Sequence, residues 1–285
     1  MQVNGAGTPA GGAPAPATAP RRWSQRVLSP WPAAWGRQRR SVADMAVAVV
    51  AMLGLLWGLG RIMAHIPGPV GAEAQSFADG AVLTVQLTVV AGLAGLLLGL
   101  LGALGKISRV PPLRWIAGLY IWIIRGTPLL VQILFVYFAV PALVPGLSLG
   151  EFTSASIALA LNVGAYNAEA IRAGLLAVPR GQVEAARSLG LNSWFTFIDI
   201  TCPQAFKISL PPLVNNIVAL LKDSSLASAI GALELTHAGQ ILSSNTYRPV
   251  PALTATALIY LALTTVMTHF SNAVERRFDI EDKLA

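Results

Sequence analysis

The sequence predicts an all-α polytopic membrane protein with six transmembrane helices. Of its 285 residues, 54% are hydrophobic and only 12% are charged, whereas an average soluble domain carries about 25% charged residues. Apolar runs long enough to cross a bilayer, about 20 residues each, recur along the chain. Lysine and arginine gather in alternate connections, which is the pattern expected when positive charge stays on the cytoplasmic side.

The same composition excludes several other classes. The net charge is +7, but the basic residues are spread between apolar segments and form no dense basic helix, which argues against a nucleic-acid partner. A single cysteine, Cys202, allows neither an internal disulfide nor a cysteine-based metal cluster. The histidines His65, His237 and His269 are far apart, so we expect no metal site.

The N-terminal part predicts a tail followed by an anchoring helix. Residues 1–41 are rich in Pro, Ala and Gly and then in Arg and Trp, which is typical of a disordered basic cytoplasmic tail that meets the membrane. The first apolar run starts too late for a cleavable secretory signal, so it predicts a transmembrane helix at 42–64. The connection 65–79 contains Glu73 and Asp79 but no lysine or arginine, which places it outside.

The second predicted span, at about 80–105, carries a stripe of glycines. Gly92, Gly95, Gly99 and Gly102 recur at steps of three and four residues, so they line one face of a helix. We interpret this stripe as a surface for tight packing against another helix.

The third span is interrupted by Arg125, Gly126, Thr127 and Pro128. We expect 115–125 to lie along the inner surface and 128–144 to cross the membrane, with Thr127 capping the second helix and Pro128 as its first residue. A single kinked helix would instead bury Arg125 in the membrane at a cost of about 2.5 kcal/mol or more.

The remaining spans are predicted at about 154–176, 210–231 and 251–273. A long cytoplasmic loop at about 179–209 follows the first of them, and an outer connection at about 232–249 contains Glu234, His237 and Arg248. With this arrangement nearly all lysines and arginines fall in the tail, the inner loops and the C-terminal end, so both termini are predicted to be cytoplasmic.

The loop from Pro179 to Pro212 is too polar to span a membrane but is strongly patterned. Helix-forming residues precede Gly190, which can adopt the left-handed conformation that ends a helix, and Asn192 or Ser193 can cap a second helix that ends before Pro203. This pattern predicts two short helices hinged at a glycine, which suits contact with a cytoplasmic partner. An amphipathic hairpin lying on the inner leaflet fits the composition equally well.

This loop resembles the EAA motif of the permease subunits of ATP-binding-cassette (ABC) importers. That motif reads EAA, three residues, Gly, nine residues, Ile, one residue, Leu-Pro. The chain has Glu184-Ala185-Ala186, Gly190, Ile200 and Cys202-Pro203, so only the leucine is replaced. From about 79 to 277 the chain is similar to permeases for polar amino acids of the histidine, glutamine and arginine type. The motifs that carry this resemblance are LTVQLT at 83–88, IRGTPLLVQ at 124–132, LNVGAYNAEAIRAG at 161–174, VPRGQVEAARSLG at 178–190 and LPPLVNNIVALLKDSSLASAIGALELT at 210–236.

The resemblance implies a type I ABC transporter transmembrane domain at 79–277, with five core helices, an additional N-terminal helix at 42–64 and a short cytoplasmic tail at 278–285. It implies a location in the bacterial inner membrane. The implied partners are two ABC ATPase subunits that bind the ATP and Mg²⁺, a second permease copy or homologue, an extracytoplasmic solute-binding protein, membrane lipid and an amino-acid substrate. The implied ATPase-coupling residues are Glu184, Ala185, Ala186 and Gly190.

Polar residues inside apolar spans mark a transport pathway or a contact between helices. One cluster, Lys222, Asp223 and Ser224, lies about a dozen residues into the fifth span, where a cation and an anion suit the two charges of an amino acid. A structural ion pair with Glu169 or Arg172 is the alternative. A second cluster in the fourth span contains Asn162, Gly164, Tyr166, Asn167 and Glu169, of which Asn162, Tyr166 and Glu169 recur at near-helical spacing. Asn215 and Asn216 are predicted to bridge to it as contacts between helices.

The predicted function is therefore transport, not catalysis. A phosphate loop of the form GxxxxGK[ST] is missing, because Gly105-Lys106 is followed by Ile107 and Leu100 stands where the first glycine belongs. The chain needs no cofactor of its own on this interpretation. An ion-coupled secondary amino acid transporter is the alternative, but it predicts an internal repeat that the sequence does not show clearly.

Overall fold

The computed structural model describes residues 37–278, and every regular element among them is helical, in agreement with the predicted all-α class. Residues 1–36 of the predicted tail and residues 279–285 of the predicted C-terminal tail lie outside the described residues. The last five residues of the predicted tail at 1–41 are helical and form the start of α1. The α-helices are α1 (Arg37–Ala64), α2 (Pro69–Ala72), α3 (Ala74–Ile107), α4 (Pro111–Gly126), α5 (Leu129–Leu134), α6 (Val140–Leu143), α7 (Glu151–Leu176), α8 (Arg180–Ser188), α9 (Ser193–Phe195), α10 (Cys202–Asp223), α11 (Leu235–Thr246) and α12 (Pro249–Arg277). Two π-helical turns, η1 (Phe135–Ala139) and η2 (Thr196–Thr201), and one 3₁₀ helix, η3 (Ser224–Ile230), join them.

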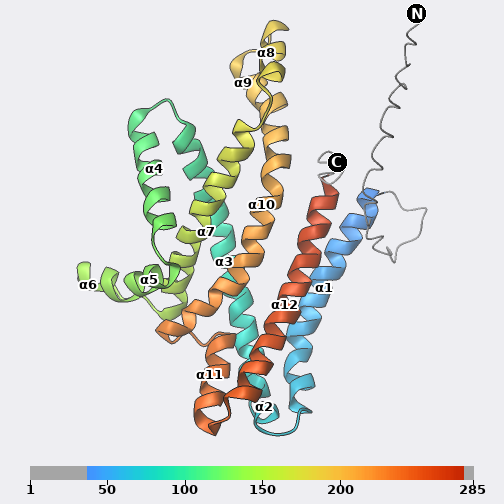
Figure 1. Cartoon of the computed structure of the whole chain (residues 1–285), viewed down its shortest axis with the longest axis vertical. Coiled ribbons are helices and arrows are strands. Elements are labelled where there is room, and N and C mark those ends of the chain that lie inside the picture. Colours follow the sequence, from blue (N-terminus) through green and yellow to red (C-terminus); the bar gives the residue numbers. More distant parts are fainter. Residues whose placement is uncertain (1–36, 279–285) are drawn as a thin grey trace, which may run out of the picture. The chain divides into compact units, whose positions relative to one another are not determined.

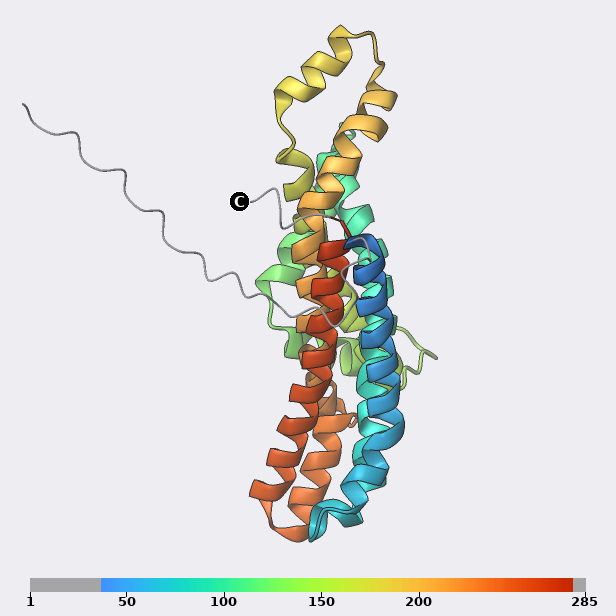
Figure 2. The same cartoon turned by 90° about the vertical axis from the view of Figure 1, so that its right-hand side faces the viewer.

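The helices between residues 37 and 278 form a bundle with two distinct ends. Helices α8 and α9 lie at one end, and α2 and α11 lie at the other (Figure 1). Helices α1 and α12 run antiparallel and side by side in both views (Figure 2). Helix α1 begins toward the α8 end, and α12 finishes there. Asp44 of α1 and Arg276 of α12 form an ion pair of 3.0 Å toward the α8 end. The predicted helix at 42–64 is thus part of the bundle, as α1.

Helix α3 packs against α7 through the predicted glycine stripe. A Cβ atom built on Gly99 would lie 2.5 Å from Cβ of Asn167, and one on Gly102 would lie 3.0 Å from Cβ of Ala168. A Cβ on Gly95 would overlap the side chain of Val163. All four glycines of the stripe are buried. The prediction of tight helix packing is confirmed, since only residues without a side chain fit this contact.

The break near Pro128 is confirmed, but its expected geometry is wrong. The chain bends by 110° between 111–126 and 129–143. Helix α4 runs alongside α3 and α7, and Tyr120 Oη donates a 2.7 Å hydrogen bond to the carbonyl of Leu161; the segment 129–143 lies across the bundle (Figure 1). Thr127 does not cap the second helix, because its hydroxyl donates to the carbonyl of Ile123 in α4 and Pro128 holds the cap position of α5. The sequence had predicted that 128–144 crosses the membrane and that 115–125 lies along its surface. In the structure α4 is the part that runs along the bundle, because it packs against α3.

The expected end of a helix before Pro203 is also wrong. The chain stays helical from Ser193 through η2 and α10 to Ile230. The π-helical turn η2 widens the backbone ladder just before Pro203, which then falls in the first turn of α10, where a missing N–H is tolerated. The second arm of the loop is therefore continuous with the helix that enters the bundle.

Helix α11 replaces most of the loop expected at 232–249. Glu234, which is fully buried, caps it by accepting hydrogen bonds from the backbone N–H groups of Thr236 at 2.8 Å and His237 at 2.9 Å. Tyr260 of α12 donates a 2.7 Å hydrogen bond to the same carboxylate. Hydropathy misses α11 because it is short and carries polar side chains, whereas the cap ties it firmly to α12.

The described residues hold three helices that are long and apolar enough to span a membrane, namely α1, α3 and α12, or up to five spans if each bent pair is counted as one. The second bent pair is 193–230 with 235–246, at 48°. The sequence had predicted six spans. The difference is α7, which is 26 residues long but less apolar than α1, α3 and α12, because it carries Asn162, Tyr166, Asn167 and Glu169.

Candidate transport pathway and coupling hairpin

The predicted glycine hinge is present between α8 and α9. Gly190 has a φ of +86°, in the left-handed region that strains side chains other than glycine. Its N–H donates to the carbonyl of Arg187 at 3.0 Å, and the N–H of Leu191 donates to that of Ala186 at 3.2 Å, a helix end of the Schellman type. Asn192 then caps α9 by accepting a 3.0 Å hydrogen bond from the N–H of Phe195. We call the segment 180–201 the coupling hairpin, after the role that the sequence predicts for it.

The four sequence-predicted residues of the coupling hairpin differ in exposure. Glu184 and Ala185 are exposed, and Gly190 is exposed at the turn. Ala186 is buried, and the helix that carries it, α8, packs against η2. A small buried side chain at this position is compatible with a close approach of the two arms.

Sequence reasoning missed the apolar residues at the tip of the coupling hairpin. Leu189 is 82% exposed and Trp194 is 65% exposed, and Phe195 is also exposed. They flank the turn at Gly190 and lie at the end of the bundle occupied by α8 and α9 (Figure 1). The sequence feature that could have identified them is the presence of large apolar residues on both sides of a glycine turn.

A polar cavity of about 360 Å³ lies where α5, α7 and α10 meet. Its polar lining comes from Thr127 at the break before α5, Asn162 and Tyr166 of α7, and Asn216 and Asp223 of α10. The guanidinium of Arg125 lies 5.3 Å from the centre of the Tyr166 ring. Three predicted pathway residues, Asn162, Tyr166 and Asp223, are thus brought together although 61 residues separate the first from the last.

The other three predicted pathway residues do not line this cavity. Glu169 accepts a 2.7 Å hydrogen bond from Arg172 of its own helix, so these two residues pair with each other and not with the fifth span. Lys222 is exposed. The hydroxyl of Ser224 is buried and donates to the carbonyl of Leu221.

The predicted asparagine bridge between the fourth and fifth spans is present. Asn216 of α10 donates a 2.9 Å hydrogen bond to Asn167 of α7, which donates in turn to the carbonyl of Gly95 in α3 at 3.4 Å. Asn215 is exposed. The bridge joins three helices next to the polar cavity, as expected for contacts between helices in an apolar environment.

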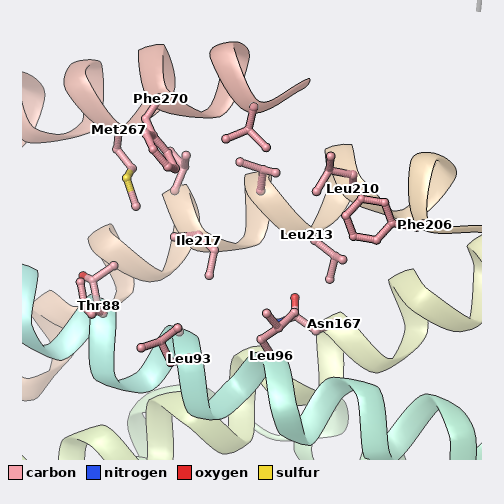
Figure 3. Close-up of a pocket in the computed structure, with 15 residues that line it drawn as sticks. Thr88, Leu93, Leu96, Asn167, Phe206, Leu210, Leu213, Ile217, Met267 and Phe270 are labelled. Atoms are coloured by element: carbon pink, nitrogen blue, oxygen red, sulfur yellow. The ribbon is translucent and has the colours of Figure 1, made fainter. Parts of the chain in front are cut away.

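A larger cavity of about 550 Å³ lies between α3, α10 and α12 (Figure 3). Its wall is almost entirely apolar, with Leu93, Leu213, Ile217 and Phe270 among the side chains that point into it. The charged groups of an amino acid would lose their hydration there without gaining a partner. Of these two cavities, the smaller one therefore offers the polar partners that a charged ligand needs.

Comparison with known proteins agrees with this architecture. The family described as binding-protein-dependent transport system inner membrane component matches residues 95–280. The chain is 39% identical over 210 residues to the L-cystine transport system permease protein TcyB of Bacillus subtilis, covering 72% of this chain and 89% of the relative. It is 38% identical to the arginine transport system permease protein ArtQ of the same species, covering 72% of this chain and 93% of the relative. It is 36% identical to the glutamine transport system permease protein GlnP of Escherichia coli, covering 71% of this chain and 92% of the relative.

Solved structures show the same fold. An amino acid ABC transporter crystallised with histidines matches with a TM-score of 0.67 and 41% identity, covering 71% of this chain and 94% of that one. The MetNI methionine ABC transporter matches with a TM-score of 0.59 at 20% identity, which is a likeness of fold. The chain thus belongs to the binding-protein-dependent transport system inner membrane components, the permease subunits of ABC importers.

Proposed function

We propose that this chain moves a polar amino acid through the polar cavity, driven by ATP hydrolysis in a separate ATPase subunit. The observation that carries the proposal is the convergence of Asn162, Tyr166 and Asp223 on one cavity within an amino-acid-permease fold. The relatives are named for L-cystine, arginine and glutamine, which all carry an ammonium and a carboxylate group.

The coupling hairpin is the proposed contact with the ATPase. Glu184 and Ala185 would face the partner, Gly190 would hold the turn, and Ala186 would hold the two arms together. Its continuity with the bundle supports this role, because the second arm continues into α10, and α10 carries Asn216 and Asp223 to the polar cavity. A push on the hairpin would therefore reach the cavity along one helix. The exposed Leu189 and Trp194 add apolar contact area of the kind that anchors protein interfaces.

The proposed topology has six crossings, made by α1, α3, the bent segment 111–143, α7, α10 with α11, and α12. Helix α7 is included because it packs between α3 and α10 and forms the asparagine bridge to both. The last five crossings form the proposed type I core at 79–277, and α1 is additional to it. Helix α1 begins toward the α8 end and α12 finishes there, which supports placing both chain termini on the cytoplasmic side with the coupling hairpin.

The proposed assembly follows from the family. It comprises two ATPase subunits that bind ATP and Mg²⁺, a second permease copy or homologue, and an extracytoplasmic solute-binding protein, all at the inner membrane of a bacterium. The tail at 1–41, with its arginines and tryptophans, is proposed to meet the headgroups of anionic lipids.

The alternative is an ion-coupled secondary transporter, and energisation separates the two. The complete transporter in proteoliposomes should take up labelled L-arginine, L-glutamine or L-histidine only when ATP is supplied on the side of the coupling hairpin. Uptake driven by a sodium or proton gradient without ATP would show that the protein is an ion-coupled secondary transporter and not an ABC importer subunit.

Asp223→Asn should weaken amino-acid binding to the purified permease about tenfold or more. The carboxylate is the charged group of the cavity wall among the described residues, and a charge-assisted hydrogen bond is worth more than a neutral one. Binding is measured by titration of the purified chain, because uptake also depends on the solute-binding protein. Asp79→Asn, at an exposed position of α3 outside both the cavity and the coupling hairpin, serves as the matched control. Unchanged affinity in Asp223→Asn would remove the cavity from the pathway.

A further inference from the structure

Gln132 occupies an unusual position, since its buried side chain joins three helical segments beside the polar cavity. It lies in α5, just past the 110° bend, and is 9% exposed. Its Nε2 lies 2.7 Å from the carbonyl oxygen of Ile124, 3.1 Å from that of Thr127 and 2.9 Å from the Thr127 hydroxyl oxygen. The amide thus holds the end of α4 to the start of α5. A buried amide with this many partners fixes local geometry, because breaking any contact leaves a polar group unpaired.

These contacts also decide which way the Gln132 amide points. Backbone carbonyl oxygens only accept hydrogen bonds, so the end of the amide that faces Ile124 and Thr127 must be the NH₂ group. The oxygen Oε1 then faces α7, where it accepts a 3.1 Å hydrogen bond from Nδ2 of Asn162. The backbone carbonyls at the end of α4 therefore fix the orientation of the Gln132 amide, and Gln132 in turn fixes which end of the Asn162 amide faces it.

The orientation of Asn162 follows in turn. Because its NH₂ group is turned toward Gln132, its Oδ1 is directed elsewhere, and no donor among residues 37–278 pairs with that oxygen. Asn162 lines the polar cavity together with Asp223. The cavity wall thus offers two acceptors, a neutral amide oxygen and a carboxylate, which together suit a group that donates several hydrogen bonds and carries positive charge.

We infer that Gln132 is a positioning residue that holds the Asn162 amide with its oxygen toward the cavity, where that oxygen and Asp223 accept the ammonium group of the substrate. The inference rests on the proposed function of the cavity as the substrate pathway. It assigns Gln132 a role in substrate affinity, which it exerts through Asn162 and without contact to the substrate.

The test is a double-mutant cycle on amino-acid affinity. The full-length chain, purified with its ATPase in nanodiscs, is titrated with L-arginine, L-glutamine and L-histidine, and the dissociation constant is followed for the tightest-binding probe. Gln132→Leu should raise that constant about tenfold, and so should Asn162→Leu, each by loss of one oriented hydrogen bond to a charged group. In the Asn162→Leu background, Gln132→Leu should add less than about twofold. Gln240→Leu, on the exposed face of α11, is the matched control and should leave affinity unchanged.

A second readout identifies the substrate group. The desamino analogue of the same amino acid, which lacks the α-ammonium, should bind the wild type about as weakly as the amino acid binds Gln132→Leu. Gln132→Leu should not weaken binding of the analogue any further. If Gln132→Leu fails to accumulate, Gln132→Met replaces it, because its uncharged thioether cannot donate to the carbonyls of Ile124 and Thr127 and is only a weak acceptor for Asn162.

Two results would overturn the inference. Effects of Gln132→Leu and Asn162→Leu that multiply in the double variant would show that Gln132 acts independently of Asn162, as would an unchanged affinity in Gln132→Leu. The outcome for Asp223→Asn separates the two levels of the argument. If Asp223→Asn weakens binding while Gln132→Leu does not, only the positioning role fails; if neither does, the proposed pathway fails with it.

Discussion

Gly190→Val should lower substrate uptake at least tenfold while the protein still inserts and accumulates. Gly190 has a φ of +86°, and a β-branched residue in this region is strained by about 1–2 kcal/mol or more. The turn would relieve the strain by changing its backbone, which breaks the hydrogen bonds from the N–H groups of Gly190 and Leu191 back to α8. The two arms of the coupling hairpin would then lose their fixed relation. Uptake and membrane content of the variant are measured in the same cells.

Gly146→Val is the control for this experiment. Gly146 has a nearly identical φ of +83° and equally open surroundings, but it lies in the connection between α6 and α7, away from the hairpin. It should retain most of its uptake. Equal losses in the two variants would mean that backbone strain alone, and not the coupling hairpin, explains the effect.

Gly99→Val should reduce the amount of folded protein at least fivefold. Even a single Cβ at this position would lie 2.5 Å from Cβ of Asn167 and 3.3 Å from the backbone nitrogen of Ala168, and neither atom can move without shifting α7. Overpacking of a tight contact typically costs about 1–3 kcal/mol, and displaced Asn167 would also lose its hydrogen bond from Asn216. Fluorescence-detected size-exclusion chromatography in detergent gives the folded fraction.

The matched control is Gly54→Val in α1, where an added Cβ meets no atom within 4 Å. This variant should run as the wild type does. A monodisperse Gly99→Val protein at wild-type yield would show that the contact between α3 and α7 is looser than described.

The sequence was sufficient to predict the long helices because their hydropathy is continuous. The predicted spans at 42–64, 80–105, 154–176 and 251–273 fall within α1, α3, α7 and α12. The glycine hinge at Gly190 was also predictable, since few residues other than glycine adopt its conformation. Where tertiary packing overrides local preference, prediction failed, as in the orientation of α4 and the continuation of the helix through Pro203.

The candidate site was predictable only in part. Polarity within an apolar span marked Asn162, Tyr166 and Asp223, and the fold brings them to one cavity. The same criterion also marked Glu169, which is paired with Arg172 of its own helix. Polarity cannot separate these cases, because both a pathway and an internal ion pair keep polar groups within an apolar span. The partner of each side chain, which only the fold specifies, makes the distinction.

Co-purification tests the central claim most directly, namely that the coupling hairpin joins this chain to an ABC ATPase. The tagged chain is extracted in mild detergent and its co-purifying subunits are identified, for the wild type and for Glu184→Lys, which reverses an exposed charge on α8. We expect the wild type to retain an ABC ATPase with measurable ATP hydrolysis, and Glu184→Lys to lose the ATPase or its substrate-stimulated activity. A wild-type chain that purifies without an ATPase and yet moves amino acid down an ion gradient would contradict the account.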